Sequence, residues 1–215
     1  MRKRFSKLVF YLLMFLPAIC NFFLWDKLPD FVPTRISITG NVSKYANKYS
    51  VWVLPMLSIL SGSLYLIIGK LANLQEKYGN NNEKYSYIFA LVPLSILNII
   101  NFYLILLYFD KSLIHFSIYN LVFGSLAVGM ILEGNYLPKT KVNNWIGIRL
   151  FGNIKNDDAW KTSQKFGGIT LIISGILILL GSLFILNNKF LIIYTCIVTL
   201  SNLSIIILYT YKITK

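Results

Sequence analysis

The sequence predicts an all-α integral membrane protein, built as a bundle of six transmembrane helices with its N- and C-termini in the cytoplasm. Hydrophobic residues make up 56% of the 215 residues and charged residues only 13%, with a mean hydropathy of +0.62. Soluble domains carry about 25% charged residues. The apolar residues also gather in long runs rather than in short periodic groups. This pattern indicates a single polytopic membrane domain that spans residues 1–215.

Six apolar segments have the length of about 20 residues that a helix needs to cross a bilayer. We expect spans at residues 7–25, 51–71, 85–109, 113–132, 168–186 and 190–209. The third and fourth are joined only by residues 110–112, and the last two by residues 187–189, so each pair should form an antiparallel hairpin. The bulky Ile19 before Cys20 argues against a cleaved signal peptide, so the first segment is interpreted as an uncleaved span.

The distribution of Lys and Arg sets the expected orientation. With six spans, fifteen of these residues fall on the side that holds both termini and six on the other side. Basic residues in short loops are retained on the cytoplasmic side of a membrane. We therefore expect cytoplasmic termini, an extracytoplasmic loop at residues 26–50 and a cytoplasmic loop at residues 133–167.

The pattern of ionisable residues argues against an enzyme. His115 and Glu133 lie near opposite ends of the fourth span, where we expect boundary residues in reach of water rather than catalysts. The chain has one histidine and no H-E-x-x-H or phosphate-loop motif, and Cys20 and Cys196 are isolated, so no catalytic residue, metal or cofactor is expected. The basic residues behind the net charge of +13 are spread among short loops. They predict contact with the lipid bilayer and no direct nucleic-acid binding.

Four asparagines in the third, fourth and sixth predicted spans are candidates for contacts between helices. Asn98 and Asn101 are three residues apart and share a helical face, and Asn120 and Asn202 occupy later spans. We expect these amides to form hydrogen bonds between helices, while a role in lining a substrate path stays open.

The loop at residues 26–50 is longer than a connection between two helices requires. Pro29 and Pro33 favour extended chain as it leaves the membrane, and Gly40 permits a turn. The alternation from Arg35 to Ile38 indicates a short strand. Such a loop either simply connects two spans or forms a small module of its own.

The loop at residues 133–167, here named the signature loop, is the longest polar segment of the chain. Gly134 and Asn135 are suited to a left-handed helix cap, and Pro138 stops the helix. Asp157 and Asp158 favour a short helix from about Ala159. The tryptophans at positions 145 and 160, together with nearby basic residues, predict a segment lying along the membrane surface.

Two stretches of this sequence resemble a known family. The run from Gly134 to Arg149, GNYLPKTKVNNWIGIR, followed by Trp160 and by KFGG at residues 165–168, is similar to the defining loop of the SdpI family of bacterial membrane immunity proteins. LPDFVP at residues 28–33, with Gly40, Tyr45 and Lys48, resembles the extracytoplasmic N-terminal module of the same proteins. The resemblance covers both large loops in the family's order.

The resemblance implies a membrane protein that protects the producing cell against a secreted antimicrobial peptide toxin. It also implies a sensor role, in which the toxin-bound protein holds a small winged-helix autorepressor at the membrane. The candidate toxin-binding residues of the outer loop are Pro29, Pro33, Arg35, Gly40, Tyr45 and Lys48. The candidate regulator-binding residues of the inner loop are Asn135, Pro138, Lys139, Asn143, Gly147, Arg149 and Trp160, unless this loop only braces the helices.

The sequence departs from the family pattern at several positions. Arg35 stands where the family usually has His, Ser43 where it has Asp, and residues 150–153 replace its T-P-W-T run. These differences concern the identity of the toxin and of the regulator. The alternative function is a permease or transporter subunit, or another non-enzymatic polytopic membrane protein.

Overall fold

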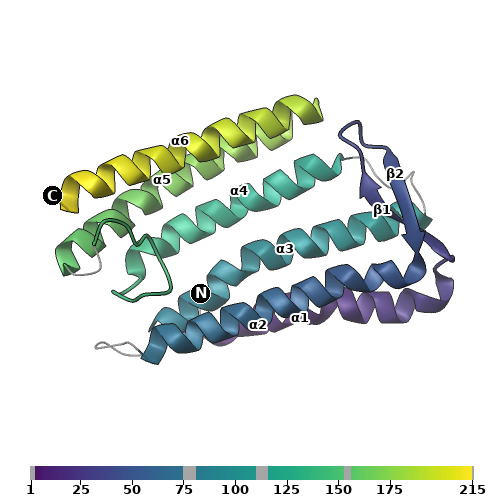
Figure 1. The fold of residues 1–215 in the computed structure, drawn as a ribbon, viewed down its shortest axis with the longest axis horizontal. Coiled ribbons are helices and arrows are strands. Elements are labelled where there is room, and N and C mark those ends of the chain that lie inside the picture. The colour runs from purple at the N-terminus through teal and green to yellow at the C-terminus, as the bar shows by residue number, and fades with distance from the viewer. Residues whose placement is uncertain (1–2, 75–80, 110–115, 153–155, 215) are drawn as a thin grey trace.

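The computed structural model describes residues 3–74, 81–109, 116–152 and 156–214 of the chain (Figure 1). Within these residues, six helices are long and apolar enough to cross a membrane. They are α1 (Lys3–Leu24), α2 (Val53–Leu74), α3 (Asn81–Phe109), α4 (Ile118–Tyr136), α5 (Asp157–Phe184) and α6 (Asn188–Thr214). The chain is thus an all-α multi-pass membrane protein, and its one small sheet lies at one end of the bundle.

The helices form two groups of three (Figure 1). Helices α1, α2 and α3 enclose a core around Phe10, Met14 and Leu94, and α4, α5 and α6 enclose another around Met130 and Ile178. The two halves meet chiefly along α3 and α4. At that seam the hydroxyls of Ser95 and Ser125 lie 2.9 Å apart within hydrogen-bonding distance, and small residues allow the helices to approach.

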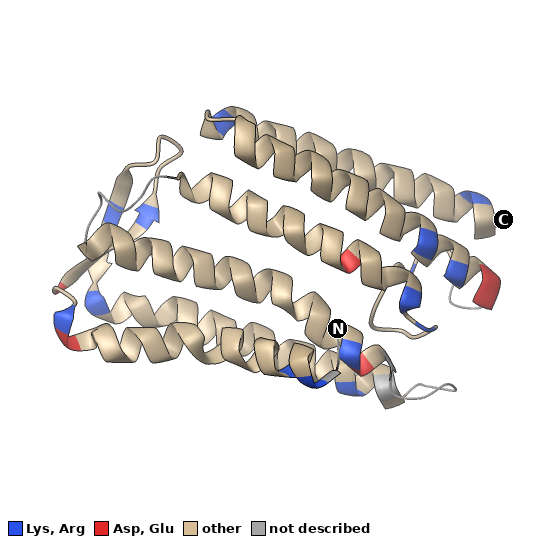
Figure 2. Cartoon of the chain, turned by 180° about the vertical axis from the view of Figure 1, so that it is seen from behind, with Lys and Arg blue, Asp and Glu red and all other residues tan. Residues whose placement is uncertain are grey.

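Charged residues gather at the two ends of the bundle, and the long middle of the helices is almost free of them (Figure 2). This distribution is typical of a protein whose middle lies in hydrocarbon. Both termini lie at the end opposite the sheet (Figure 1). We name the end that carries the sheet the hairpin end, and the opposite end, where both termini lie, the loop end.

The fourth helix differs from the sequence prediction at both of its ends. It begins at Ile118 because the Ser117 hydroxyl accepts a hydrogen bond from the Tyr119 amide. The predicted start at Leu113, the turn at residues 110–112 and His115 lie outside the described residues. The predicted left-handed cap at Gly134 and Asn135 is wrong, because the helix continues through both residues to Tyr136.

The predicted short helix near Ala159 is instead the first turn of α5, which runs without a break into the membrane span. Its N-cap is Asn156, whose Oδ1 accepts hydrogen bonds from the amides of Asp158 and Ala159 at 2.9 and 3.3 Å. The carboxylates of Asp157 and Asp158 then sit in the first turn, where the helix dipole favours negative charge. Local capping therefore starts this helix eleven residues before the predicted span.

Hydrogen bonds between helices are confirmed for three of the four asparagines. Asn101 and Asn21 bond reciprocally, Nδ2 to Oδ1, at 3.1 and 3.2 Å, and Asn98 Nδ2 donates to the Leu13 carbonyl at 2.8 Å. Asn120 Nδ2 donates to the Ser182 carbonyl at 2.6 Å. Asn202 is buried, but its Oδ1 accepts no hydrogen bond from the described residues.

Candidate functional site

The hairpin end carries a two-stranded antiparallel sheet of β1 (Phe31–Ile36) and β2 (Val42–Asn47). The predicted strand at residues 35–38 is therefore placed too late and lacks its partner. Gly40 has φ of +86° in the connecting turn, a conformation that glycine adopts without strain. Asn188 Nδ2 donates to the Ile38 carbonyl at 2.7 Å, so the tip of the hairpin is tied to the start of α6.

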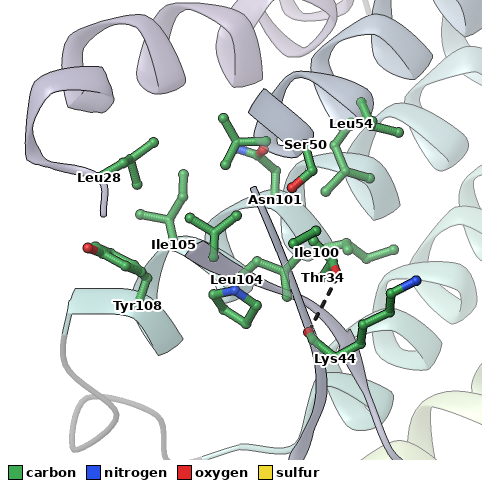
Figure 3. A pocket seen from close by; sticks show the side chains of 15 residues that line it. Leu28, Thr34, Lys44, Ser50, Leu54, Ile100, Asn101, Leu104, Ile105 and Tyr108 are labelled. Carbon is green, nitrogen blue, oxygen red and sulfur yellow. Dashed lines mark hydrogen bonds between the residues drawn. The ribbon is translucent and has the colours of Figure 1, made fainter. Parts of the chain in front are cut away.

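A cavity of about 310 Å³ lies beneath this hairpin (Figure 3). Strand residues such as Val32, Pro33 and Ala46 form its roof, and α2 and α3 supply most of the opposite wall. The lining is mainly aliphatic, and Asn101, Ser50 and Thr34 add polar groups. The Ser50 hydroxyl is buried and has no hydrogen-bond partner among the described residues. This cavity can accept apolar side chains or an acyl chain together with a few hydrogen-bonding groups.

Only one of the six predicted outer residues lines the cavity. Pro33 is buried in its roof, opposite Tyr45 in the strand register, whereas the Tyr45 side chain is 60% exposed. Pro29 and Arg35 are exposed, Gly40 makes the turn, and the Lys48 ammonium lies 4.7 Å from the centre of the Trp25 ring. The six residues thus shape one hairpin without converging on one point.

Sequence reasoning missed most of the cavity lining. The roof residues Thr34, Lys44 and Ala46 alternate in strands that were only partly predicted, and the floor comes from α3 residues such as Leu104. The alternation of residues in β2 was only a weak signal for the roof. For the floor there was no such signal, because lipid-facing and cavity-facing leucines look alike in a sequence.

At the loop end, residues 140–152 form what we name the clasp segment. It follows the turn η4 (Leu137–Lys139) and is organised by Asn143, which is 3% exposed. Asn143 Oδ1 accepts from the amides of Trp145 and Ile146 at 2.8 and 2.6 Å. Its Nδ2 donates to the carbonyls of Lys141 and Ile146 at 2.7 and 3.0 Å. One asparagine therefore satisfies four backbone groups of a segment that has no regular secondary structure.

Trp160 fixes the clasp segment to α5. Its side chain is 1% exposed, and its Nε1 donates to the Thr140 carbonyl at 3.0 Å. Gln164, one turn later, donates to the Ile148 carbonyl at 2.7 Å and accepts from the Ile148 amide at 2.9 Å. The prediction that Trp160 lies at the membrane surface is wrong, because these long-range contacts bury it. Trp145, by contrast, is 39% exposed.

The clasp segment also holds the first half of the bundle. Ile146 packs with Ala72, Tyr85 and Ile88 of α2 and α3. Asn82 Oδ1 accepts from the Lys141 amide at 3.1 Å, and Asn82 Nδ2 donates to the Lys141 carbonyl at 3.3 Å. Residues 140–152 thus join the two halves at the loop end, and their position along the bilayer surface stays a prediction.

Glycines allow the close packing around the clasp segment. Gly147 has φ of +106°, and a Cβ there would meet Gln164 Oε1 at 2.8 Å. Gly134 of α4 faces Gly168 of α5 so closely that a Cβ on either would lie 2.5 Å from the carbonyl oxygen of the other. These positions exclude larger residues for structural reasons.

The seven predicted inner residues therefore separate into two groups. Asn143, Gly147 and Trp160 build the fold of the loop. Asn135, Pro138, Lys139 and Arg149 are exposed. Lys139 Nζ lies 4.7 Å from the centre of the Tyr136 ring, and Arg149 donates to the Asn144 carbonyl. Only the exposed group is available to a partner.

Comparison with known proteins supports the resemblance stated above. Residues 139–210 match the model of the SdpI/YfhL protein family, and residues 12–59 match a domain of unknown function, DUF1648. The first match covers the clasp segment with α5 and most of α6, and the second covers the hairpin with parts of α1 and α2. None of the curated proteins and none of the solved structures matches the chain. The match of residues 139–210, with the amino-terminal domain before it, supports membership of this six-helix membrane protein in the SdpI family.

Proposed function

We propose that this protein is an immunity protein of the bacterial cytoplasmic membrane that protects the producing cell against a secreted antimicrobial peptide. The observation that carries the proposal is membership of the SdpI family, which supports an immunity-type role. Neither matched family is described as enzymatic. The positive-inside rule supports an extracytoplasmic hairpin end and a cytoplasmic loop end.

The cavity beneath the hairpin is the proposed contact for the peptide. It is mainly apolar, and the Lys44 side chain extends from its edge (Figure 3). Among the described residues 26–50, the basic side chains Lys27, Arg35, Lys44 and Lys48 outnumber the acidic Asp26 and Asp30. An amphiphilic peptide with apolar side chains and an acidic group complements such a surface.

The test is protection of a sensitive strain. The gene is expressed in a strain that lacks it, and the minimum inhibitory concentration of the peptide purified from the producer's culture medium is measured. Expression should raise this concentration. Unchanged killing with the protein present in the membrane would contradict the proposed function.

The cavity is tested with a pair of substitutions on the hairpin. Ala46→Phe fills the cavity from β2 and should abolish protection, because it occupies the space in which the peptide binds. Thr39→Phe adds the same ring at the exposed tip and should leave protection intact. Equal protection by both variants would move the peptide site away from the cavity.

We further propose that the exposed group at the loop end, Asn135, Pro138, Lys139 and Arg149, binds a small winged-helix autorepressor when the peptide is bound outside. A ligand site on one side and a binding surface on the other are what such a sensor requires. Co-sedimentation of the repressor with membranes should rise on addition of the peptide and should fall for the variant Lys139→Gln/Arg149→Gln. Repressor that stays soluble with peptide present would restrict the function to protection.

A further inference from the structure

A second cavity, of about 300 Å³, lies between the two halves at the loop end. Its walls come from α2, α3, α4 and α5, and the clasp segment closes one side. The side chain that distinguishes it is Glu133, which was expected to be a boundary residue in reach of water. It is the single acidic residue of α4, a helix long and apolar enough to cross a membrane.

The Glu133 carboxylate is partly buried, and among the described residues nothing forms a hydrogen bond or ion pair with it. A carboxylate removed from water is costly unless a partner compensates its charge. The lysine of the adjoining turn does not supply that partner, because Lys139 Nζ lies over the Tyr136 ring. The cavity therefore holds a carboxyl group without a counter-ion among the described residues, and a cation bound beside it would stabilise the ionised form.

The remaining lining points to the chemistry of the missing partner. The Tyr65 side chain lines the same cavity and lies close enough to Glu133 for an electrostatic interaction. Phe89 and Trp145 add aromatic rings to the wall. Aromatic faces and a carboxylate both attract cations. A divalent metal ion is disfavoured, because Glu133 is a lone carboxylate and the described residues contain no group of three His, Cys, Asp or Glu side chains able to hold a metal.

We propose that this cavity binds an alkylammonium or guanidinium group, with Glu133 as its counter-ion and the Tyr65 hydroxyl as a hydrogen-bond acceptor. The aromatic rings of Phe89 and Trp145 contact the alkyl or guanidinium part of the ligand. The group is either a free small cation, such as a polyamine, or the Lys or Arg side chain of another protein. One wall of the cavity belongs to the clasp segment and consists of Trp145, Ile146 and Ile148. A bound cation therefore stabilises this segment in the position that the structure shows. The site is independent of the proposed immunity function.

The experiment is isothermal titration calorimetry on the full chain, purified in detergent. Two cationic probes are titrated, spermidine and N-acetyl-lysine amide, with N-acetyl-norleucine amide as the uncharged analogue. We expect saturable binding of at least one cation and none of the analogue. Binding of spermidine alone indicates a free cation, whereas binding of the lysine amide indicates a protein side chain.

Two variants and a matched control locate the site. Glu133→Gln keeps the shape of the side chain and removes its charge, and should weaken binding about 10- to 100-fold. Tyr65→Phe should weaken it about 3- to 10-fold, which keeps the test decisive if the first variant fails to fold. The matched control is Glu83→Gln, which should leave binding unchanged. The Glu83 carboxylate lies outside the cavity and accepts a hydrogen bond from the Tyr87 hydroxyl at 3.0 Å. Absence of saturable cation binding, equal binding of the uncharged analogue, or full affinity in both cavity variants would overturn the proposal.

Discussion

The four hydrogen bonds of Asn143 predict that Asn143→Ala opens the clasp segment locally. Alanine would leave the amides of Trp145 and Ile146 and the carbonyls of Lys141 and Ile146 without their partner. A net hydrogen bond contributes about 1 kcal/mol, and buried groups left unsatisfied cost more. Since the four bonds are not independent, we expect the free energy of local opening to fall by about 2 to 4 kcal/mol. This corresponds to a roughly 30- to 1000-fold larger open population.

Amide hydrogen exchange of the purified protein, followed by mass spectrometry of peptides that cover residues 140–152, measures this opening. The matched control is Asn135→Ala, because Asn135 is exposed on α4 and a surface substitution of this kind changes stability by less than about 0.5 kcal/mol. If exchange in the clasp segment were as slow in Asn143→Ala as in Asn135→Ala, the organising role assigned to Asn143 would be wrong.

Three further predictions concern the contacts between elements. Gly134→Ala should destabilise the α4–α5 pair by about 2 kcal/mol or more, because its Cβ would meet the Gly168 carbonyl oxygen. The control Gly124→Ala should be tolerated, because its Cβ would meet only the Ser182 side chain, with the hydroxyl at 3.3 Å. Thermal unfolding in detergent measures both effects. Asn188→Ala should speed hydrogen exchange at the hairpin tip about 5- to 30-fold, since the bond to the Ile38 carbonyl is lost, with no change in the clasp segment. The double variant Ser95→Cys/Ser125→Cys should form a disulfide on oxidation. The cross-link is detected as faster electrophoretic migration that a reducing agent reverses. Failure to form it would contradict the close packing of α3 against α4.

The six spans could be predicted because a bilayer demands about 20 apolar residues from each helix, whatever its neighbours. The ends of the helices could not be predicted from hydropathy, because they depend on helix capping and on close contacts between helices. Asn156 starts α5 in a polar stretch, and Gly134 stays helical because it faces Gly168 across a close helix contact. The strand β2 was missed because its polar residues alternate weakly and a two-stranded hairpin depends on its surroundings for stability.

The candidate residues of the signature loop show what kind of information a motif carries. Asn143 and Gly147 were predicted as regulator-binding residues, and the structure shows that Asn143 forms backbone hydrogen bonds and that Gly147 adopts a positive φ, both of which shape the loop. Trp160 was assigned to the membrane surface from its residue type alone. Its burial follows from the Thr140 carbonyl, twenty residues earlier in the chain, and such a contact cannot be deduced from composition.

The contacts at the two ends bear on how a signal could cross the bundle. The hairpin lies over α2 and α3 of the first half, and its tip is bonded to Asn188 of the second half. The clasp segment likewise bonds to Asn82 of the first half and to Trp160 and Gln164 of the second. The halves themselves meet chiefly along one helix pair, α3 and α4. A small rotation about this seam would change the contacts at both ends together, because each end is attached to both halves. The fold therefore contains a physical connection between the proposed peptide site beneath the hairpin and the proposed partner surface around the clasp segment, which the proposed sensor role requires.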